Sequence, residues 1–386
     1  MASFKLLSHD LPSKQNVGSM HEACPKSGRP TSFRVYQFPS SSQPSTVQTV
    51  QTQHQLSQGP NISANMTKLI VIVGITGNQG GSVAHRFHSD PAYRIRGLTR
   101  DPSSAVAKKL SSAGIEIVQA NLDDVSSLIK AFESANLIFS VTNYWEPFFR
   151  PDSRAAASTQ GISCRRYAYD VELQQGKNIA DAAAAVVSGL DDNGFIASTL
   201  SHAGKCSGGK FKELYHFDAK ADVFPFYVKE KHPELERKMS CVQTGYFMSS
   251  WKLAPGAYFA KQDDGSFVMS FPTSPEAKVP HFAVNRDMGN FVYAVSKRAP
   301  GGEYMAAGET CTWPVFLGKW CEVTGKKARY QEITLEQFME ASPDKEFGRE
   351  AGDMFAYSTE PGYDGGMKLV YAEELEKVCA CLRVVM

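Results

Sequence analysis

The sequence predicts an α/β protein in which a doubly wound parallel sheet carries a smaller C-terminal α+β lobe. The first observation is an unbroken apolar run at 69–73, mostly β-branched, which is typical of a buried parallel strand. A glycine-rich turn at 74–81 and a helical pattern at 82–87 follow it directly. The second observation is that strand and helix patterns keep alternating as far as residue 200, as a doubly wound sheet requires.

The glycine-rich turn reads Gly74-Ile-Thr-Gly77-Asn-Gln-Gly80-Gly81. A glycine pattern between a strand and a helix indicates dinucleotide binding, since glycines permit a tight turn, a close backbone approach to pyrophosphate and close helix packing. The free N–H groups of the helix N-terminus also favour phosphate. The G-x-x-G-x-x-G spacing is typical of extended and atypical short-chain dehydrogenases. The alternative is a glycine turn that binds no ligand.

The other elements of the sheet follow in regular order. Strand patterns run at 93–99, 115–119, 137–141 and 193–200, and helical patterns run at 104–113, 125–132 and 171–185. Because parallel strands place their carboxyl ends at one edge, Gly74, Arg100, Asn121 and Asn143 should converge there. Farther along we expect a helix at 216–229, a strand and loop at 240–251, and a helix at 333–341 among aromatic, proline-rich strands.

Arg100 directly follows the second strand of this sheet. An acid at this place would favour NAD, whereas an arginine accommodates the 2′-phosphate of NADP. A charge-assisted contact of this kind supports a preference for NADP of about tenfold or more. Asp101 is expected to start the turn before Pro102 instead of binding ribose. The alternative for Arg100 is a solvated side chain at a strand end.

Composition sets the domain organisation and excludes several functions. The 386 residues suit one large or two ordinary domains, and a formal charge of +1 gives no case for direct nucleic-acid or anionic-membrane binding. No apolar run approaches the roughly 18 residues of a membrane span. Eight cysteines without a C-x-x-C pair indicate reduced thiols and no metal site. We therefore expect a cytoplasmic protein, with the nucleus as an additional compartment.

Three segments are expected along the chain. Residues 1–65 are rich in Ser, Thr and Gln and predict a disordered extension, with a mitochondrial transit peptide as the alternative. Residues 66–240 form the Rossmann-type NAD(P)-binding domain, with a polar insertion at about 148–170 that we expect to be a surface excursion. Residues 241–386 form the smaller substrate or partner lobe, partly interleaved with the core.

Five motifs in sequence order resemble the NmrA-like family. They are Gly74 to Gly81, Thr99-Arg-Asp-Pro102, Thr142-Asn-Tyr-Trp-Glu146, Gln175-Gly-Lys177 and His216-Phe-Asp-Ala-Lys220, and Phe355 to Gly366 looks like the fungal branch. The resemblance runs from about Met66 to about Gly366. It implies an atypical short-chain dehydrogenase/reductase fold that binds NADP(H). Family members are redox-sensing regulators of transcription factors or oxidoreductases, several of them in fungal specialised metabolism.

The resemblance also implies a set of cofactor contacts. They are Gly74, Ile75, Thr76, Gly77, Asn78, Gln79, Gly80, Arg100, Asp101, Ser103, Ser104, Asn121, Leu122, Thr142, Asn143, Tyr144, Lys177 and Lys220, together with Tyr246, Phe247, Met248 and Ser249 in a loop beside the nicotinamide. Asn121 departs from the family, which often has an acid there. The tail after Gly366 matches no family feature and suggests an altered C-terminus.

The catalytic motif is incomplete. Short-chain dehydrogenases use Tyr-x-x-x-Lys, and this chain has His216-x-x-x-Lys220. Lys220 is expected to hold the ribose, and His216 has a reference pKa near neutrality that suits a general acid, unless it is merely structural. Tyr246 is a proton donor or, alternatively, an aromatic wall of the pocket.

Two functions therefore remain open. One is an NADP(H)-dependent oxidoreductase acting on a small organic substrate, which the aromatic lobe with Trp251, Tyr258, Phe259, Phe267 and Phe271 favours. The other is a catalytically silent NADP(H) sensor with a transcription-factor partner, which the missing tyrosine favours. A scaffold that has lost its cofactor is a weaker third.

Overall fold

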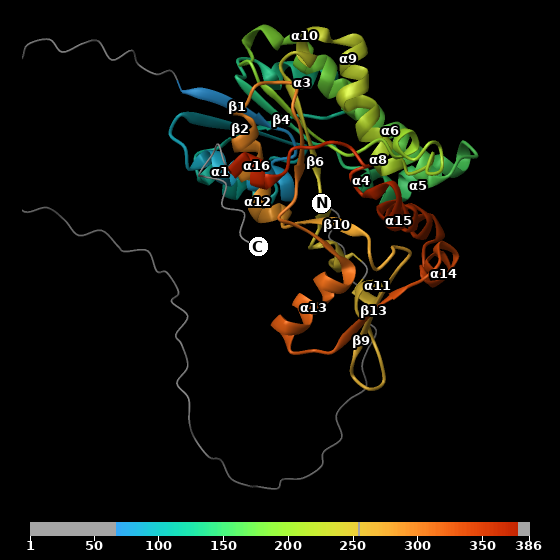
Figure 1. Cartoon of the computed structure of the whole chain (residues 1–386). Coiled ribbons are helices and arrows are strands. Elements are labelled where there is room, and N and C mark those ends of the chain that lie inside the picture. Colours follow the sequence, from blue (N-terminus) through green and yellow to red (C-terminus); the bar gives the residue numbers. More distant parts are fainter. Residues whose placement is uncertain (1–66, 254, 377–386) are drawn as a thin grey trace, which may run out of the picture. The chain divides into compact units, whose positions relative to one another are not determined.

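The computed structural model describes residues 67–253 and 255–376, and all of them belong to one compact unit (Figure 1). The disorder expected at 1–65 and the cysteines at 24, 379 and 381 lie outside the described residues. No helix in the described part of the chain is both long and apolar enough to cross a bilayer.

The centre of the fold is a seven-stranded parallel sheet, which confirms the predicted class. Its strand order is β11-β6-β5-β4-β1-β2-β3. The strands are β1 Lys68–Ile72, β2 Tyr93–Thr99, β3 Glu116–Gln119, β4 Leu137–Ser140, β5 Phe195–Thr199, β6 Met239–Thr244 and β11 Glu303–Ala306. The chain order reverses beside β1, between β2 and β4, and such a switch point is where doubly wound sheets bind ligands.

Helices cover both faces of the sheet. On one face α1 (Asn78–His88) packs against α12 (Val284–Val295), and on the other lie α3 (Val125–Phe132) and α6 (Cys164–Ala185) (Figure 1). A Cβ on Gly289 would lie 2.2 Å from the Ser82 carbonyl oxygen, so glycine there permits the close crossing of α12 over α1. The shorter helix α2 (Ala105–Ser112) precedes β3.

The insertion at about 148–170 is helical, and it combines exposed residues such as 158–161 with a buried part that its polar composition does not predict. It forms α4 (Trp145–Phe149), α5 (Pro151–Thr159) and the beginning of α6, whose first turn is capped by Ser163. Phe148 is fully buried, and Arg165 is only 6% exposed. Arg165 departs from the expected surface position because its charge is neutralised inside the protein by Glu350.

The helix expected at 216–229 is interrupted. Helix α8 (Tyr215–Ala221) continues into the π-type segment η2 (Asp222–Tyr227) and then α9 (Val228–Lys231). Phe224 is extended and Pro225 follows it, and a proline inside a helix removes a hydrogen bond and clashes with the preceding turn. The short helices α7 (Ala203–Cys206), α10 (Pro233–Glu236) and η1 (Val187–Gly189) complete this half.

The C-terminal lobe contains two three-stranded sheets, β12-β10-β7 and β13-β9-β8. Their strands are β7 Tyr246–Phe247, β8 Ala260–Lys261, β9 Phe267–Phe271, β10 Lys278–Phe282, β12 Glu309–Thr312 and β13 Ala328–Glu332. The helical segments are η3 Ser250–Lys252, α11 Pro255–Tyr258, α13 Trp313–Thr324, α14 Leu335–Ala341, α15 Lys345–Tyr357, η4 Ser358–Gly362 and α16 Ala372–Glu376. The central sheet crosses the expected boundary at residue 240, since it contains β6 and β11.

Candidate functional site

The glycine turn after β1 has the geometry that its spacing predicts. Gly74 has a φ of +65°, a conformation that L side chains rarely adopt. A Cβ on Gly80 would lie 2.4 Å from the Gly74 carbonyl oxygen, so a side chain there would collide with the turn. Gly77 takes the N-cap position of α1 and is exposed. The backbone of the turn is therefore open to a ligand.

The N-terminus of α1 has the features of a candidate anion site. It has no side-chain cap among the described residues and no acid in its first turn, so its first N–H groups are unpaired by side chains. Thr76 and Asn78 are exposed, and Ile75 lies in the core below them. Gln79 Oε1 is buried without a partner in the described part of the chain. The uncapped N–H groups, and not the Gln79 oxygen, suit the pyrophosphate of a dinucleotide.

In the turn after β2, the Arg100 side chain is exposed and the Asp101 carboxylate accepts hydrogen bonds from within the turn. The guanidinium of Arg100 is 62% exposed and lies 2.8 Å from the Glu146 carboxylate. Ser103 donates its hydroxyl and its N–H to Asp101 Oδ1, which lowers the pKa of that carboxyl. Ser104 caps α2 by accepting the Ala107 N–H. Asp101 therefore starts the turn, and the Arg100 guanidinium is the exposed charge beside it.

Two exposed asparagines follow β3 and β4 at the same edge of the sheet. Asn121 Oδ1 accepts the Asp123 N–H at 3.2 Å, and Asn143 Oδ1 accepts the Trp145 N–H at 3.2 Å. The Leu122 carbonyl accepts a hydrogen bond from Asn178 of α6. Because these strands are parallel, Gly74, Arg100 and both asparagines follow strand ends on one side, as expected.

Lys220 lies in a small polar cluster with Thr142 and Glu172. Its ammonium contacts Glu172 Oε1 directly and lies 3.5 Å from Thr142 Oγ1, which donates to the same carboxylate oxygen at 2.7 Å. Glu172 is 1% exposed, and its Oε2 has no partner among the described residues. The Lys220 ammonium is thus paired with the buried Glu172 carboxylate, one oxygen of which has no partner in the described part of the chain.

His216 is fixed from one side by Glu350. Oε1 of Glu350 accepts the His216 backbone N–H at 2.8 Å and lies 2.7 Å from Nδ1, while Arg165 donates to Oε2 at 2.8 Å. Burial opposes ionisation, but the His216 hydrogen bonds and the charge of Arg165 outweigh it, so the pKa of Glu350 lies below its usual value. The ionised carboxylate selects the His216 tautomer with hydrogen on Nδ1.

Tyr144 packs beside this histidine, with ring centroids 5.7 Å apart. Its hydroxyl donates to the Arg165 carbonyl at 3.1 Å, and burial raises the pKa of Tyr144 well above its usual value. Tyr144 is 1% exposed, so its ring supports His216 from inside the protein.

Two further expected site residues, Lys177 and Tyr246, contact aromatic rings. Lys177 has its ammonium 5.4 Å from the Tyr227 ring centroid, beside η2. The Tyr246 hydroxyl is buried without a partner in the described chain, within an aromatic cluster that includes Trp313 at 5.0 Å. Phe247 is half-buried, and Met248 is 46% exposed in the loop that ends with Ser249.

Three functional candidates were missed in the sequence: Glu172, Glu350 and Arg165. Glu172 stands one helical turn before Gly176, whose Cβ would lie 2.8 Å from a methyl of Val223 in η2. A small residue one turn from an acid marks a helix face that packs closely, and this was the available clue for Glu172. Nothing local marks Glu350, which lies 134 residues from His216.

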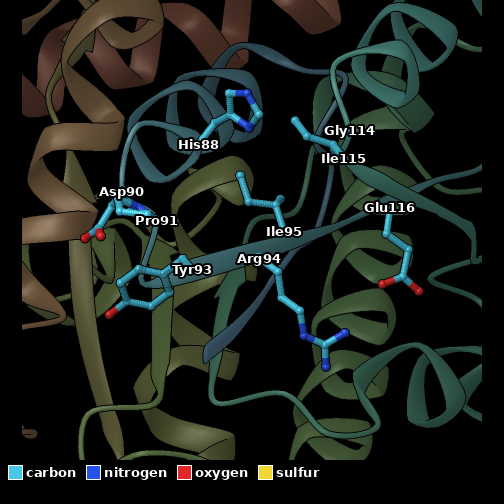
Figure 2. A pocket seen from close by; sticks show the side chains of 9 residues that line it. All are labelled: His88, Asp90, Pro91, Tyr93, Arg94, Ile95, Gly114, Ile115 and Glu116. Atoms are coloured by element: carbon cyan, nitrogen blue, oxygen red, sulfur yellow. The ribbon is translucent and has the colours of Figure 1, made fainter. Parts of the chain in front are cut away.

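Two hollows of the surface lie away from the glycine turn. One has a volume of about 430 Å³ and is lined by residues that include His88, Tyr93, Arg94 and Glu116, whose side chains are drawn in Figure 2. Tyr93 and Glu116 begin β2 and β3, so this hollow lies at the amino ends of the strands. The second, of about 280 Å³, is lined by His202, Asp218 and Asp222 among others. The first does not belong to the carboxyl edge of the sheet, whereas His202 in the second follows the carboxyl end of β5 by three residues.

The parallel sheet, the open glycine turn and the uncapped α1 define a Rossmann-type protein of the kind that binds dinucleotides at its switch point. The chain belongs to the NmrA-like family, whose model matches residues 66–381. The match extends beyond Gly366, so the expectation that the whole tail departs from the family was wrong.

Relatives and a solved structure agree with this assignment. The chain is 24% identical over 287 residues to the NmrA-like family domain-containing oxidoreductase FrzB of Cladobotryum sp, covering 69% of this chain and 77% of FrzB. It is 28% identical over 283 residues to the oxidoreductase hkm9 of Aspergillus hancockii, covering 69% and 76%. The crystal structure of NmrA, a negative transcriptional regulator, in complex with NADP superposes with a TM-score of 0.60 at 16% identity, covering 82% and 92%.

Proposed function

We propose that the chain is an NADP(H)-dependent oxidoreductase that acts on a small organic substrate. The observation that carries the proposal is the uncapped N-terminus of α1, which opens at the same sheet edge as Arg100 and the Lys220 cluster. The names of FrzB and hkm9 as oxidoreductases, and the NADP complex of NmrA, support it.

The residues of this chain divide the task of holding the dinucleotide. The N–H groups of α1 suit the pyrophosphate, Arg100 suits the 2′-phosphate, and Lys220 suits a ribose hydroxyl. Glu172 orients the Lys220 ammonium in the absence of ligand. The bound dinucleotide supplies or accepts a hydride.

His216 is the proposed proton donor or acceptor. Glu350 occupies Nδ1, and Nε2 makes no hydrogen bond within the described residues. A histidine fixed in this way presents one nitrogen to a reacting group, and Glu350 stabilises the positive charge that the ring gains. Positioned proton transfer of this kind contributes about 10²–10⁴-fold to rate.

The alternative is a catalytically silent NADP(H) sensor that binds a transcription factor. The observation that favours it is the burial of His216, which is 6% exposed and packs against Tyr144, Trp145 and Phe217. In this case the dinucleotide changes the affinity for the partner, and no proton is transferred.

Calorimetric titration with NADPH, NADP+ and NADH tests the cofactor. We expect NADPH to bind, and Arg100→Ala to weaken NADPH by about tenfold or more while NADH changes little. A folded sample that binds none of the three would contradict both functions.

A substrate screen with carbonyl, imine and enone compounds then separates the two functions. We expect His216→Asn to retain NADPH affinity and to lose about 100-fold or more in turnover. Tyr246→Phe tests the other candidate proton donor, and we expect it to retain turnover because it removes a hydroxyl that is buried in the structure. Absence of turnover, together with unequal NADP+ and NADPH affinities, would favour the sensor.

A further inference from the structure

The Arg100–Glu146 ion pair joins the ends of two strands across a third. Arg100 directly follows β2, and Glu146 lies in α4 after β4. The sheet order places β1 between these strands, and the glycine turn begins where β1 ends. With 2.8 Å between guanidinium and carboxylate, the pair lies over the carboxyl edge of β1.

Glu146 is the carboxylate partner of Arg100, whereas the neighbouring Arg150 has a second acid. Glu146 contacts two arginines, with Arg150 Nη1 at 3.7 Å in addition to Arg100. Arg150 has Asp152 as a second partner at 2.8 Å. For Arg100, the described chain provides Glu146 as the paired carboxylate. The Arg100 carbonyl accepts a hydrogen bond from Gln119 at 3.2 Å, so the Arg100 backbone is anchored while its guanidinium remains exposed.

We propose that Glu146 competes with the 2′-phosphate for Arg100 and thereby sets how strongly the chain distinguishes phosphorylated from unphosphorylated dinucleotides. The proposal rests on the proposed function. A 2′-phosphate carries nearly two negative charges and pairs with a guanidinium through two hydrogen bonds. A carboxylate on the same guanidinium repels it, so Glu146 must move away when the phosphate arrives.

A ribose without the phosphate meets a different site. Its 2′-hydroxyl can donate to the Glu146 carboxylate, which is the contact that an acid provides in NAD-binding proteins. The pair therefore offers a cation to NADP(H) and an acid to NAD(H) at one place. Glu146 lowers the selectivity that Arg100 would give by itself.

The test compares Glu146→Gln with wild type in the full-length chain by calorimetric titration of NADPH and NADH. We expect NADPH to bind about threefold or more tighter to the variant and NADH to bind equally well or more weakly. Adenosine 2′,5′-bisphosphate and AMP, titrated in the same way, should show the same change and assign it to the 2′-phosphate. In an Arg100→Ala background, Glu146→Gln should tighten NADPH binding less than it does in the wild-type chain, because no guanidinium is released.

Glu116→Gln is the matched control. It removes the same charge from another Arg–Glu pair, with Arg96 at 2.9 Å, at the opposite end of the strands. We expect it to leave the ratio of NADPH to NADH affinity unchanged. An unchanged ratio in Glu146→Gln, or an equal weakening of both dinucleotides, would overturn the proposed role of Glu146 but leave the proposed function standing. Absence of all dinucleotide binding by folded wild type would instead overturn the proposed function as well.

Discussion

Gly80 and Gly81 are neighbours in the first turn of α1, but only one of them has room for a side chain. A Cβ on Gly80 would lie within 2.8 Å of three backbone atoms of Gly74 and Ile75, whereas one on Gly81 would meet nothing closer than 3.6 Å. We expect Gly80→Ala to lower the free energy of unfolding by about 1–3 kcal/mol through overpacking. Gly81→Ala should be neutral or stabilise the helix by up to about 1 kcal/mol.

Urea unfolding of both variants, followed by tryptophan fluorescence, measures this difference. The two substitutions change the same helix by the same methyl group, so helix propensity cannot separate them. Equal midpoints for Gly80→Ala and Gly81→Ala would show that the turn yields to a side chain.

Individual residues of the site differ in how far the sequence can predict them. The glycines were predictable because their role follows from local sterics within a few residues. Glu172 and Glu350 were not, because their partners Lys220 and His216 lie 48 and 134 residues away. A glutamate within a helix ordinarily faces solvent, and only the tertiary fold brings a buried cation or imidazole to these two.

Among the elements, those with a clear period were predictable and those held by charge were not. The sequence locates α3 at its observed bounds, because the apolar side chains of 125–132 repeat at helical spacing. It misses the first two turns of α6, because Arg165 and Arg166 suggest a solvated loop. In the structure Arg165 is paired with Glu350 and lies 3.7 Å from Asp353, so charge is stabilised inside the fold.

His202 joins helix α7 to α8 and η2 and makes the stability of this junction depend on pH. Its ring lies 3.0 Å from Asp218 and 3.2 Å from Asp222. Burial opposes the charged ring, but its hydrogen bonds to both aspartates outweigh burial and raise the pKa of His202 from 6.5 to about 9. The Lys205 N–H, 3.3 Å from Nδ1, suits a neutral ring, but the two carboxylates dominate over this single contact.

A histidine pKa that is higher in the folded state stabilises the fold fully below the unfolded value and loses this effect as pH rises through the folded value. We therefore expect His202→Gln to lower the free energy of unfolding by about 1–3 kcal/mol at pH 6. The difference from wild type should shrink as pH rises through about 9. Denaturant titrations at pH 6, 8 and 9.5 measure it.

Asp222→Asn provides the control for this junction. It removes one of the two carboxylates, so the loss of the His202 contribution should move to lower pH. A difference between His202→Gln and wild type that is constant from pH 6 to 9.5 would contradict a titrating histidine.

At the scale of the whole molecule, the strand order of the nucleotide-binding half can be predicted from the alternation of strands and helices in the sequence. The return of the C-terminal part to the central sheet cannot be predicted in this way. Strands β1 to β5 are apolar runs separated by helices, so their parallel pairing is predictable. Strand β11 has four residues and pairs with β6 across about 60 positions, and α12 packs on α1 from the far half of the chain. Such contacts depend on packing between distant segments, which no local pattern encodes.

The described end of the chain is part of this return. Val370 accepts the Met305 N–H at 2.9 Å and donates its own N–H to Glu303 at 2.9 Å, which places the segment beside β11. Helix α16 then packs against α12, and Leu375 is 1% exposed within the same core cluster as α1 and α12. The C-terminal segment thus packs against α12, which in turn packs against α1. The N-terminal turn of α1 is the proposed phosphate site.

We therefore expect Leu375→Ala to lower the free energy of unfolding of the whole unit by about 2–5 kcal/mol, because it leaves a cavity in the core. Leu253→Ala is the matched control, since Leu253 is 66% exposed and its truncation should change stability by less than about 0.5 kcal/mol. Urea unfolding should show a single transition that shifts only in Leu375→Ala, and the midpoint should fall for NADPH-saturated protein as well. Equal midpoints for the two variants would mean that the C-terminal segment does not support the core in solution, and that α12 holds α1 without it.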